Sequence, residues 1–344
     1  MKRFLGYLKN IPLRKKIKYG VMLSCAVIIL GLSGIGSYFK NLLPDIQADE
    51  RWDSEGGYTQ LGVYLPVGLM LDRTLYDGML YQMQTALKEQ NIEPENADGR
   101  MIVGAYSGYG SVTMKTDSSS TTVDAIGVGG DFFYFHPLDM IDGSYLTEDY
   151  LMQDYVILDK ETAWKLFGAI NVTGMSVTIN DIPFLVAGVY EKTDAYLAEE
   201  AGLDGSVVFM FYSSLEEQGV VSGIQWLDFL LPNPVNGFGE SILKENATIS
   251  LDNAVVMEHT TRFQIIPLYK LVPDYLERIM SKSGIVYPYW ENMARGYENI
   301  LVAFLLVQTV CLICGVTLLL LTIRPVKNIK RGTNWLIAKI KGRK

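Results

Sequence analysis

The sequence predicts an α+β domain held between two membrane-spanning helices. Two apolar runs without any charged residue, 21–39 and 300–323, lie towards the two ends of the 344-residue chain. A helix that crosses the roughly 30 Å hydrocarbon core of a bilayer needs about 20 apolar residues, so both runs are long enough. The intervening segment 40–299 mixes helical and strand patterns, which predicts one α+β domain built in two lobes.

The basic residues indicate how the two helices are oriented. Segments 1–20 and 324–344 together hold 15 of the 30 Lys and Arg residues and no Asp or Glu. The rest of the chain has the other 15 basic residues and all 38 acidic ones, a formal charge of −23. Short basic flanks stay on the cytoplasmic side. We therefore expect a two-pass protein of the plasma (cytoplasmic) membrane, with both termini cytoplasmic and 40–299 extracytoplasmic.

The first apolar run also has an alternative interpretation as the core of a cleaved signal peptide. Its basic flank and the small residues of Gly34–Gly36 are compatible with cleavage. The run is longer than the about 7–15 residues usual for such a core, and it continues through Tyr38 and Phe39. A retained helix is the preferred interpretation, because cleavage would leave 300–323 as the only anchor.

The first half of the outer domain contains one clear helix between predicted strands. The apolar segment 60–71 predicts a strand, and the segment after it places apolar residues at helical spacing, namely Leu75, Met79, Leu80, Met83 and Leu87. Residues 101–106 predict another strand. Segments 111–117 and 121–129 alternate in polarity and predict a hairpin with a polar serine tip.

The second half begins with the clearest local patterns. Strand 155–158 leads to Asp159, a predicted N-cap, and to a helix that ends at Gly168. Two strands joined by a tight turn follow, at 175–179 and 184–190. The remaining predictions are strands at 207–212, 224–231, 254–256 and 263–266, and helices at 237–245 and over most of 269–299.

The domain offers few side chains for catalysis or metal binding. Its two histidines, His136 and His259, are far apart in sequence, and all three cysteines lie in the apolar runs. Because neither histidine belongs to a metal or triad motif, we interpret both as structural. We assign no catalytic, cofactor-binding or metal site, and we predict that the protein is not an enzyme. The acidic domain also argues against nucleic-acid binding through phosphate contacts.

A glycine-rich segment, Gly127–Gly130, superficially suggests a phosphate-binding loop. It lacks the Lys–Ser/Thr ending of a P-loop and the spacing of a dinucleotide fingerprint. We interpret it as a turn or bulge that needs positive φ. The sequence therefore carries no ATPase motif.

The segment 127–191 resembles the extracytoplasmic core domain of MacB-type (MacB/FtsX-type) ABC transporter permeases. The resemblance lies in short matches, namely Asp131–Phe133, Leu138, Gly143, Val156–Leu158, Ala163–Gly168, Gly174–Val177 and Phe184–Val189. Two looser matches are Leu231–Pro234 and Tyr287–Asn292. Each match has the character of a cap, a turn or a strand, so the resemblance implies a fold for about 40–298 and no chemistry.

The resemblance also implies a function that depends on partners. Family permeases have one helix before this domain and three after it, whereas this sequence has one after it, which suggests a reduced permease or an accessory subunit. We expect a non-enzymatic, bilayer-anchored subunit that works with an ABC ATPase and a full-length permease. Small residues (Ser33, Ser37, Cys311, Gly315) and Gln308 with Thr309 favour helix pairing, and hence a homo- or hetero-oligomer. The alternative is a stand-alone cell-envelope binding or structural module.

Overall fold

The computed structural model describes residues 12–94, 99–147, 149–275 and 285–341, with side chains as far as residue 322. Its helices are α2 (Leu13–Asn41), η1 (Pro44–Ile46), α3 (Ala48–Trp52), α4 (Arg73–Glu89), α5 (Phe132–Phe135), α6 (Lys160–Phe167), η2 (Glu199–Leu203), α7 (Tyr212–Glu217), α8 (Phe238–Glu245), α9 (Ile265–Lys270) and α10 (Tyr289–Lys341). Its strands are β1 (Tyr58–Tyr64), β2 (Val103–Lys115), β3 (Ser120–Gly130), β4 (Asp139–Gly143), β5 (Tyr155–Asp159), β6 (Ser176–Ile179), β7 (Ile182–Glu191), β8 (Val207–Phe211), β9 (Trp226–Pro232) and β10 (Val255–Glu258).

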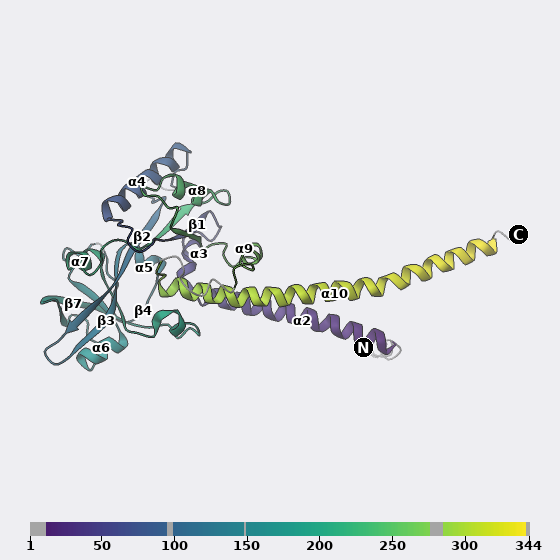
Figure 1. The fold of residues 1–344 in the computed structure, drawn as a ribbon, viewed down its shortest axis with the longest axis horizontal. Coiled ribbons are helices and arrows are strands. Elements are labelled where there is room, and N and C mark those ends of the chain that lie inside the picture. Colours follow the sequence, from purple (N-terminus) through teal and green to yellow (C-terminus); the bar gives the residue numbers. More distant parts are fainter. Residues whose placement is uncertain (1–11, 95–98, 148, 276–284, 342–344) are drawn as a thin grey trace.

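A single mixed sheet runs through both lobes of the outer domain. Its strand order is β10-β1-β9-β2-β3-β8-β5-β7-β4, and β6 pairs with β2 and β7. Most neighbours are antiparallel, whereas the pairs β3–β8 and β5–β7 are parallel. Figure 1 shows one lobe around β1, α4 and α8 and the other around β7, α6 and α7, with β2 and β3 extending between them. This arrangement confirms the predicted α+β fold class.

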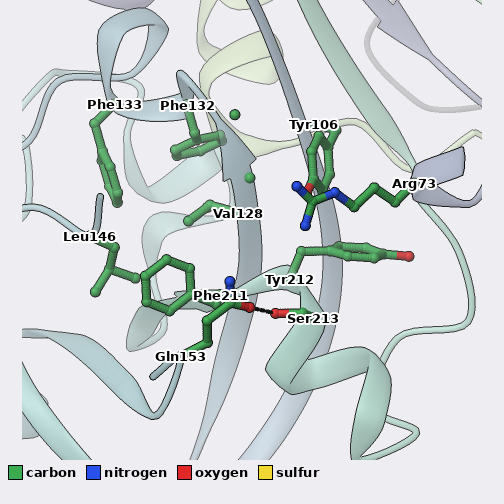
Figure 2. A pocket seen from close by; sticks show the side chains of 12 residues that line it. Arg73, Tyr106, Val128, Phe132, Phe133, Leu146, Gln153, Phe211, Tyr212 and Ser213 are labelled. Carbon is green, nitrogen blue, oxygen red and sulfur yellow. Dashed lines mark hydrogen bonds between the residues drawn. The ribbon is translucent and has the colours of Figure 1, made fainter. Parts of the chain in front are cut away.

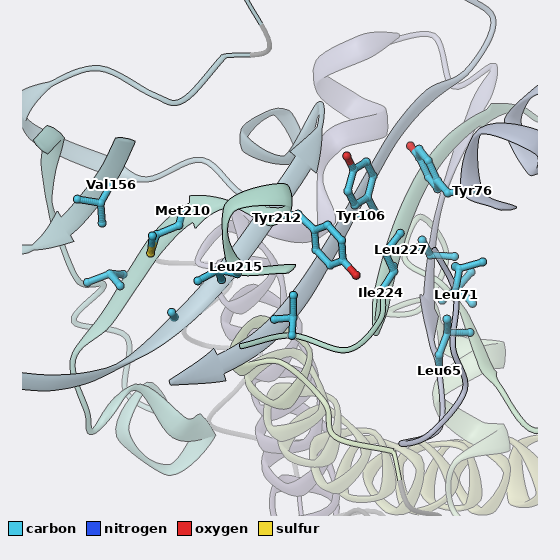
Figure 3. Packing of buried hydrophobic residues seen from close by; sticks show 14 of the residues in the cluster. Leu65, Leu71, Tyr76, Tyr106, Val156, Met210, Tyr212, Leu215, Ile224 and Leu227 are labelled. Carbon is cyan, nitrogen blue, oxygen red and sulfur yellow. The ribbon is translucent and has the colours of Figure 1, made fainter. Parts of the chain in front are cut away.

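The two faces of the sheet bury two separate apolar layers. Alternation along β9 makes this plain, because Leu227 and Phe229 belong to one layer and Trp226 and Leu230 to the other. The first layer packs beneath α4, α6, α7 and α8, and Figure 3 shows part of it around Tyr106. The second layer holds α5 and the beginning of α10, so α10 starts on the sheet itself.

Helices α2 and α10 leave the domain side by side (Figure 1). Both are long and apolar enough to cross a membrane. Gln308 Nε2 donates to Ser33 Oγ at 3.1 Å and to the carbonyl of Ile29 at 3.2 Å, so the hydrogen bond predicted for Gln308 is confirmed. Thr309 instead hydrogen-bonds Tyr269 of α9 and the carbonyl of Leu305 within its own helix.

Several local predictions are confirmed. Asp159 caps α6 by accepting from the backbone N–H of Thr162 at 3.0 Å, and Gly168 ends that helix with φ +67°. The separate strands predicted at 101–106 and 111–117 are corrected to one continuous strand, β2 (Val103–Lys115), which pairs with β3 from Ala105 to Lys115.

Two other strand predictions need correction. The strand expected at 60–71 ends at Tyr64. The strand expected at 263–266 is wrong, because Ile265 opens the helix α9 and both Ile265 and Ile266 project away from the sheet layers. The helix expected over most of 269–299 is only partly present: residues 276–284 fall outside the described residues, 271–275 and 285–288 are not helical, and α10 begins at Tyr289. The expected basic ends, 1–20 and 324–344, lie mostly outside the described residues and side chains.

Replacing Phe229 by alanine is expected to lower the free energy of unfolding by about 3–5 kcal/mol, because it leaves a cavity in a packed core. Phe229 is fully buried and stacks on Tyr76 of α4 at 6.0 Å. Chemical denaturation of the full chain in detergent measures the change. The matched control, Val235→Ala, removes an exposed side chain and should change stability by less than about 0.5 kcal/mol. Equal effects of the two substitutions would contradict the assigned core.

Candidate functional site

A buried imidazole bridges two carboxylates where the membrane helices meet the sheet. Asp45 lies in η1 just after α2, His136 follows α5, and Asp228 sits in the middle of β9. His136 Nδ1 lies 2.8 Å from Asp45 Oδ1, and His136 Nε2 lies 3.1 Å from Asp228 Oδ2. Only a doubly protonated ring donates to both carboxylates, so His136 is an imidazolium here.

The pKa of His136 is consistent with this charge. Burial disfavours the charged ring, but the carboxylates of Asp228 and Asp45 outweigh that penalty and raise its pKa to about 9. The ring also lies 4.1 Å, centroid to centroid, from the indole of Trp290. A cation against an indole face gains further stabilisation. Because Trp290 is the second residue of α10, His136 joins η1, β9 and α10 at one point.

A buried guanidinium makes the second connection to α10. Arg262 follows β10 and is 3% exposed. Its Nη1 and Nη2 donate to the two carboxylate oxygens of Glu291 at 2.8 and 3.3 Å, and its Nε donates to Glu298 Oε1 at 2.9 Å. Glu291 and Glu298 are two turns apart, so they face the same side of the helix. Paired, planar hydrogen bonds of this kind fix orientation as well as distance.

Two further residues of the sheet side complete this arrangement. Tyr64 of β1 donates its hydroxyl to Glu291 Oε2 at 3.1 Å. His259 lies with Nδ1 2.8 Å from Arg262 Nη1, so that nitrogen accepts and the ring is neutral. Burial and the positive charge of Arg262 lower the pKa of His259 to about 3. Gly62 makes room for the ring, because a Cβ there would lie 2.5 Å from His259 Nε2.

We call this cluster the joint. Its residues are Asp45, Tyr64, His136, Asp228, His259, Arg262, Glu291 and Glu298. Each is less than 9% exposed, so its charged members depend on one another rather than on water. The joint connects the sheet to the start of α10 and to the chain that leaves α2. Because its charges are paired and buried, the joint acts as a rigid connection between these elements.

The sequence identified only part of the joint. His136 and His259, interpreted from the sequence as structural, lie in one cluster rather than in unrelated places, and the charge of His136 helps to lower the pKa of His259. Asp228 was missed, although an acid inside the apolar strand 224–231 was an available signal. Within the described ranges, no group of His, Cys, Asp or Glu is arranged to hold a metal ion.

The second candidate site is a small pocket between the lobes, with a volume of about 110 Å³ (Figure 2). It is lined by Arg73, Tyr106, Val128, Gly129, Gly130, Phe132, Phe133, Leu146, Gln153, Phe211, Tyr212 and Ser213. Ser213 hydrogen-bonds the side-chain oxygen of Gln153. Both histidines of the chain lie in the joint, so Ser213 has no imidazole beside it to act as a base.

The glycines beside this pocket have two different structural roles. The turn or bulge interpreted for Gly127–Gly130 is wrong, because these residues continue the strand β3 in regular register with β2, and positive φ (+64°) occurs at Gly130, the last residue of the strand. Gly129 is required for a different reason, because a Cβ there would lie 2.1 Å from the ring of Tyr106. The pocket is therefore an aromatic recess, with the guanidinium of Arg73 at its rim, rather than a phosphate-binding loop.

The sequence pattern of one protein family, the MacB-like periplasmic core domain, matches residues 20–259. The chain belongs to this family. The match includes the apolar part of α2 and the whole sheet, and it ends at His259 in the joint. The chain is thus a membrane protein with an extracytoplasmic domain of the kind found in ABC-type transporter permeases, a family that is generally non-enzymatic.

Three solved structures align with this chain at low sequence identity. The extracellular domain of the noncanonic ABC-type transporter YknZ from Gram-positive bacteria is 20% identical, with a TM-score of 0.38, and the alignment covers 58% of this chain and 99% of that one. The periplasmic region of MacB from Actinobacillus actinomycetemcomitans is 20% identical, with a TM-score of 0.41 and coverage of 60% and 92%. A domain of a putative permease from Porphyromonas gingivalis is 11% identical, with a TM-score of 0.34 and coverage of 59% and 89%. No curated protein matches the chain.

The charge of His136 predicts a pH dependence for this MacB-like domain. Its folded pKa, about 9, is above the unfolded value of about 6.5. The stabilisation is therefore fully present below about pH 6.5 and is lost as the pH rises through about 9. Urea titrations of the full chain in detergent should show the free energy of unfolding falling across this window.

Two histidine variants test the assignment. His136→Gln should flatten the decline in stability between about pH 6.5 and 9, because the titrating group is gone. His259→Asn is the matched control, since its amide oxygen can still accept from Arg262 and the ring it replaces is neutral throughout this window. An unchanged decline in His136→Gln would show that His136 is not the group responsible.

Proposed function

We propose that the protein is a non-enzymatic, permease-like or accessory subunit of an ABC-type transport system. Its outer domain contacts a substrate or an envelope partner, and α10 conveys movement between that domain and the membrane. The observation that carries this proposal is the continuity of α10. One helix, Tyr289–Lys341, begins inside the joint and continues through the apolar run 300–323.

The length and attachment of α10 support its role as a lever. A helix of 53 residues extends about 80 Å, far more than the hydrocarbon thickness of a bilayer. Its first turns are fixed to the sheet by Trp290, Glu291 and Glu298, all of which are buried. Tilting or rotation of α10 in the membrane would therefore displace the sheet, because these contacts leave the helix little freedom to move relative to the sheet.

The source of such movement is proposed to be a separate ATPase. The sequence contains no P-loop, and the family to which the chain belongs is named for a domain of ABC-type permeases. The ATPase would act from the cytoplasm on a full-length permease that pairs with α2 and α10. Apolar side chains of α10 that project outward, such as Val310, Leu312 and Ile313, are available for a homo- or hetero-oligomeric contact in the bilayer.

Purification from mild detergent tests the partnership. We expect an ABC ATPase or a full-length permease to copurify with the intact chain. In a variant whose runs 21–39 and 300–323 are replaced by unrelated apolar helices, the partner should be lost while the outer domain stays folded. Recovery of the intact chain without either partner would count against the proposal.

The alternative is a stand-alone envelope binding or structural module, and the interlobe pocket is the observation that favours it. Its aromatic lining around Tyr106 and Phe211, with Arg73 at the rim, suits one apolar or aromatic side chain next to an acidic group of a bound peptide. This function needs no particular membrane helices. In the helix-replacement variant it would persist, so the same experiment separates the two proposals.

The basic ends support an orientation with both termini in the cytoplasm. Arg14, Lys15, Lys16 and Lys18 begin α2, ahead of its apolar part. A green fluorescent protein fused after residue 344 should therefore fluoresce, whereas alkaline phosphatase at the same position should be inactive. The control is the same pair of reporters fused after residue 288, where the phosphatase should be active. The reverse pattern would overturn the proposed topology.

A further inference from the structure

Helix α9 lies beside the membrane-spanning part of α10. Leu268 of α9 is buried in a cluster with Leu301 and Leu305 of α10. Its neighbour Tyr269 hydrogen-bonds the hydroxyl of Thr309. These contacts fall within the apolar run 300–323, whereas the contacts that α10 makes in the joint involve its first turns.

The contact with Thr309 indicates how deep α9 lies. Thr309 is nine residues beyond Ile300, the start of the apolar run, which corresponds to about 14 Å along the helix axis. A tyrosine side chain is too short to bridge that distance from the membrane surface. The backbone of α9 therefore lies below the outer end of the run, at the level of the outer half of the hydrocarbon core, which is about 15 Å thick.

The exposed side of α9 is apolar at this level. Ile265 is 64% exposed and Ile266 is 71% exposed. Leaving two such side chains in water forgoes about 1.5–3 kcal/mol each, compared with an apolar environment. Lys270 ends the helix, and its long stem allows the ammonium group to reach the polar interface while the apolar side stays deeper.

A groove of about 260 Å³ lies directly beside Ile265. Ile265 and Leu268 form one wall, and α2 and α10 form the others through residues such as Leu32, Leu301 and Phe304. Lys40 stands at its outer end, where it pairs with Glu50. The groove is continuous with the outward surfaces of both membrane helices.

We propose that α9 is embedded in the outer leaflet, where the acyl chains of bilayer lipids cover Ile265 and Ile266 and fill the groove. The occupant is lipid hydrocarbon because α9 packs on a segment that is itself surrounded by lipid. The family match ends at residue 259, so α9 lies beyond it. This third membrane contact does not depend on the proposed ATPase partnership. It holds the joint at a fixed height above the bilayer and limits how far α10 can tilt.

Depth-dependent quenching in liposomes tests the proposal. Cys25, Cys311 and Cys314 are replaced by serine or alanine, and Ile266→Cys is labelled with an environment-sensitive fluorophore. Phosphatidylcholine with a nitroxide on the upper part of its acyl chain should quench this label several-fold more than aqueous iodide does. The matched control is Val235→Cys, which is equally exposed at 71% and precedes α8, a helix that packs beside α4 rather than α10 (Figure 1).

The control label should show the reverse preference, with strong iodide quenching and no nitroxide effect. Ile265→Cys provides a second position on α9 if the Ile266 variant folds poorly. Iodide quenching of both α9 labels at the level of the control would overturn the proposal and place α9 in water. Disulfide cross-linking between two Ile266→Cys chains under a mild oxidant, without nitroxide quenching, would instead assign this surface to a second copy of the chain.

Discussion

Arg262 imposes a constraint that fixes the position of α10 against the outer domain. A guanidinium that is 3% exposed must have its donors satisfied by the protein, and Glu291 and Glu298 accept three of its hydrogen bonds. Removing one partner of a buried ion pair typically costs about 3–5 kcal/mol. The helix therefore has one favourable register on the sheet. That register determines how the membrane segment of α10 is positioned relative to the joint and the two lobes.

The helix caps, helix ends and helical spacing of this chain could be predicted because each depends on residues that are close in sequence. The cap at Asp159, the stop at Gly168 and the spacing of Met79 and Met83 each depend on residues within a turn or two. The strand predicted at 263–266 failed because consecutive apolar residues also suit a short helix in an apolar environment. Ile265 and Ile266 are exposed on the protein surface, where the proposed lipid would cover them. The apolar pattern of the sequence alone does not distinguish a surface that faces lipid from one that packs in a protein core.

The joint could not be assembled from the sequence because its contacts are long-range. Asp45 and Asp228 reach His136 from 91 and 92 residues away, and Tyr64 reaches Glu291 across 227. Strand alternation could have shown that Asp228 faces the same side as Trp226, but not that an imidazolium would meet it there. The family resemblance predicted the sheet, and its loose match Tyr287–Asn292 includes Glu291, but it did not indicate which residues Glu291 would contact.

The geometry of the joint determines which movements of α10 can reach the outer domain. A register shift by one residue combines a rise of about 1.5 Å with a turn of about 100° and would carry Glu291 and Glu298 away from Arg262, so it is opposed by the full cost of a broken buried pair. A tilt that carries the helix and the sheet together leaves those pairs intact. Trp290, enclosed between His136 and Trp226, resists rotation at the same point. In the proposed function, a tilt of the membrane segment would therefore become a swing of both lobes together.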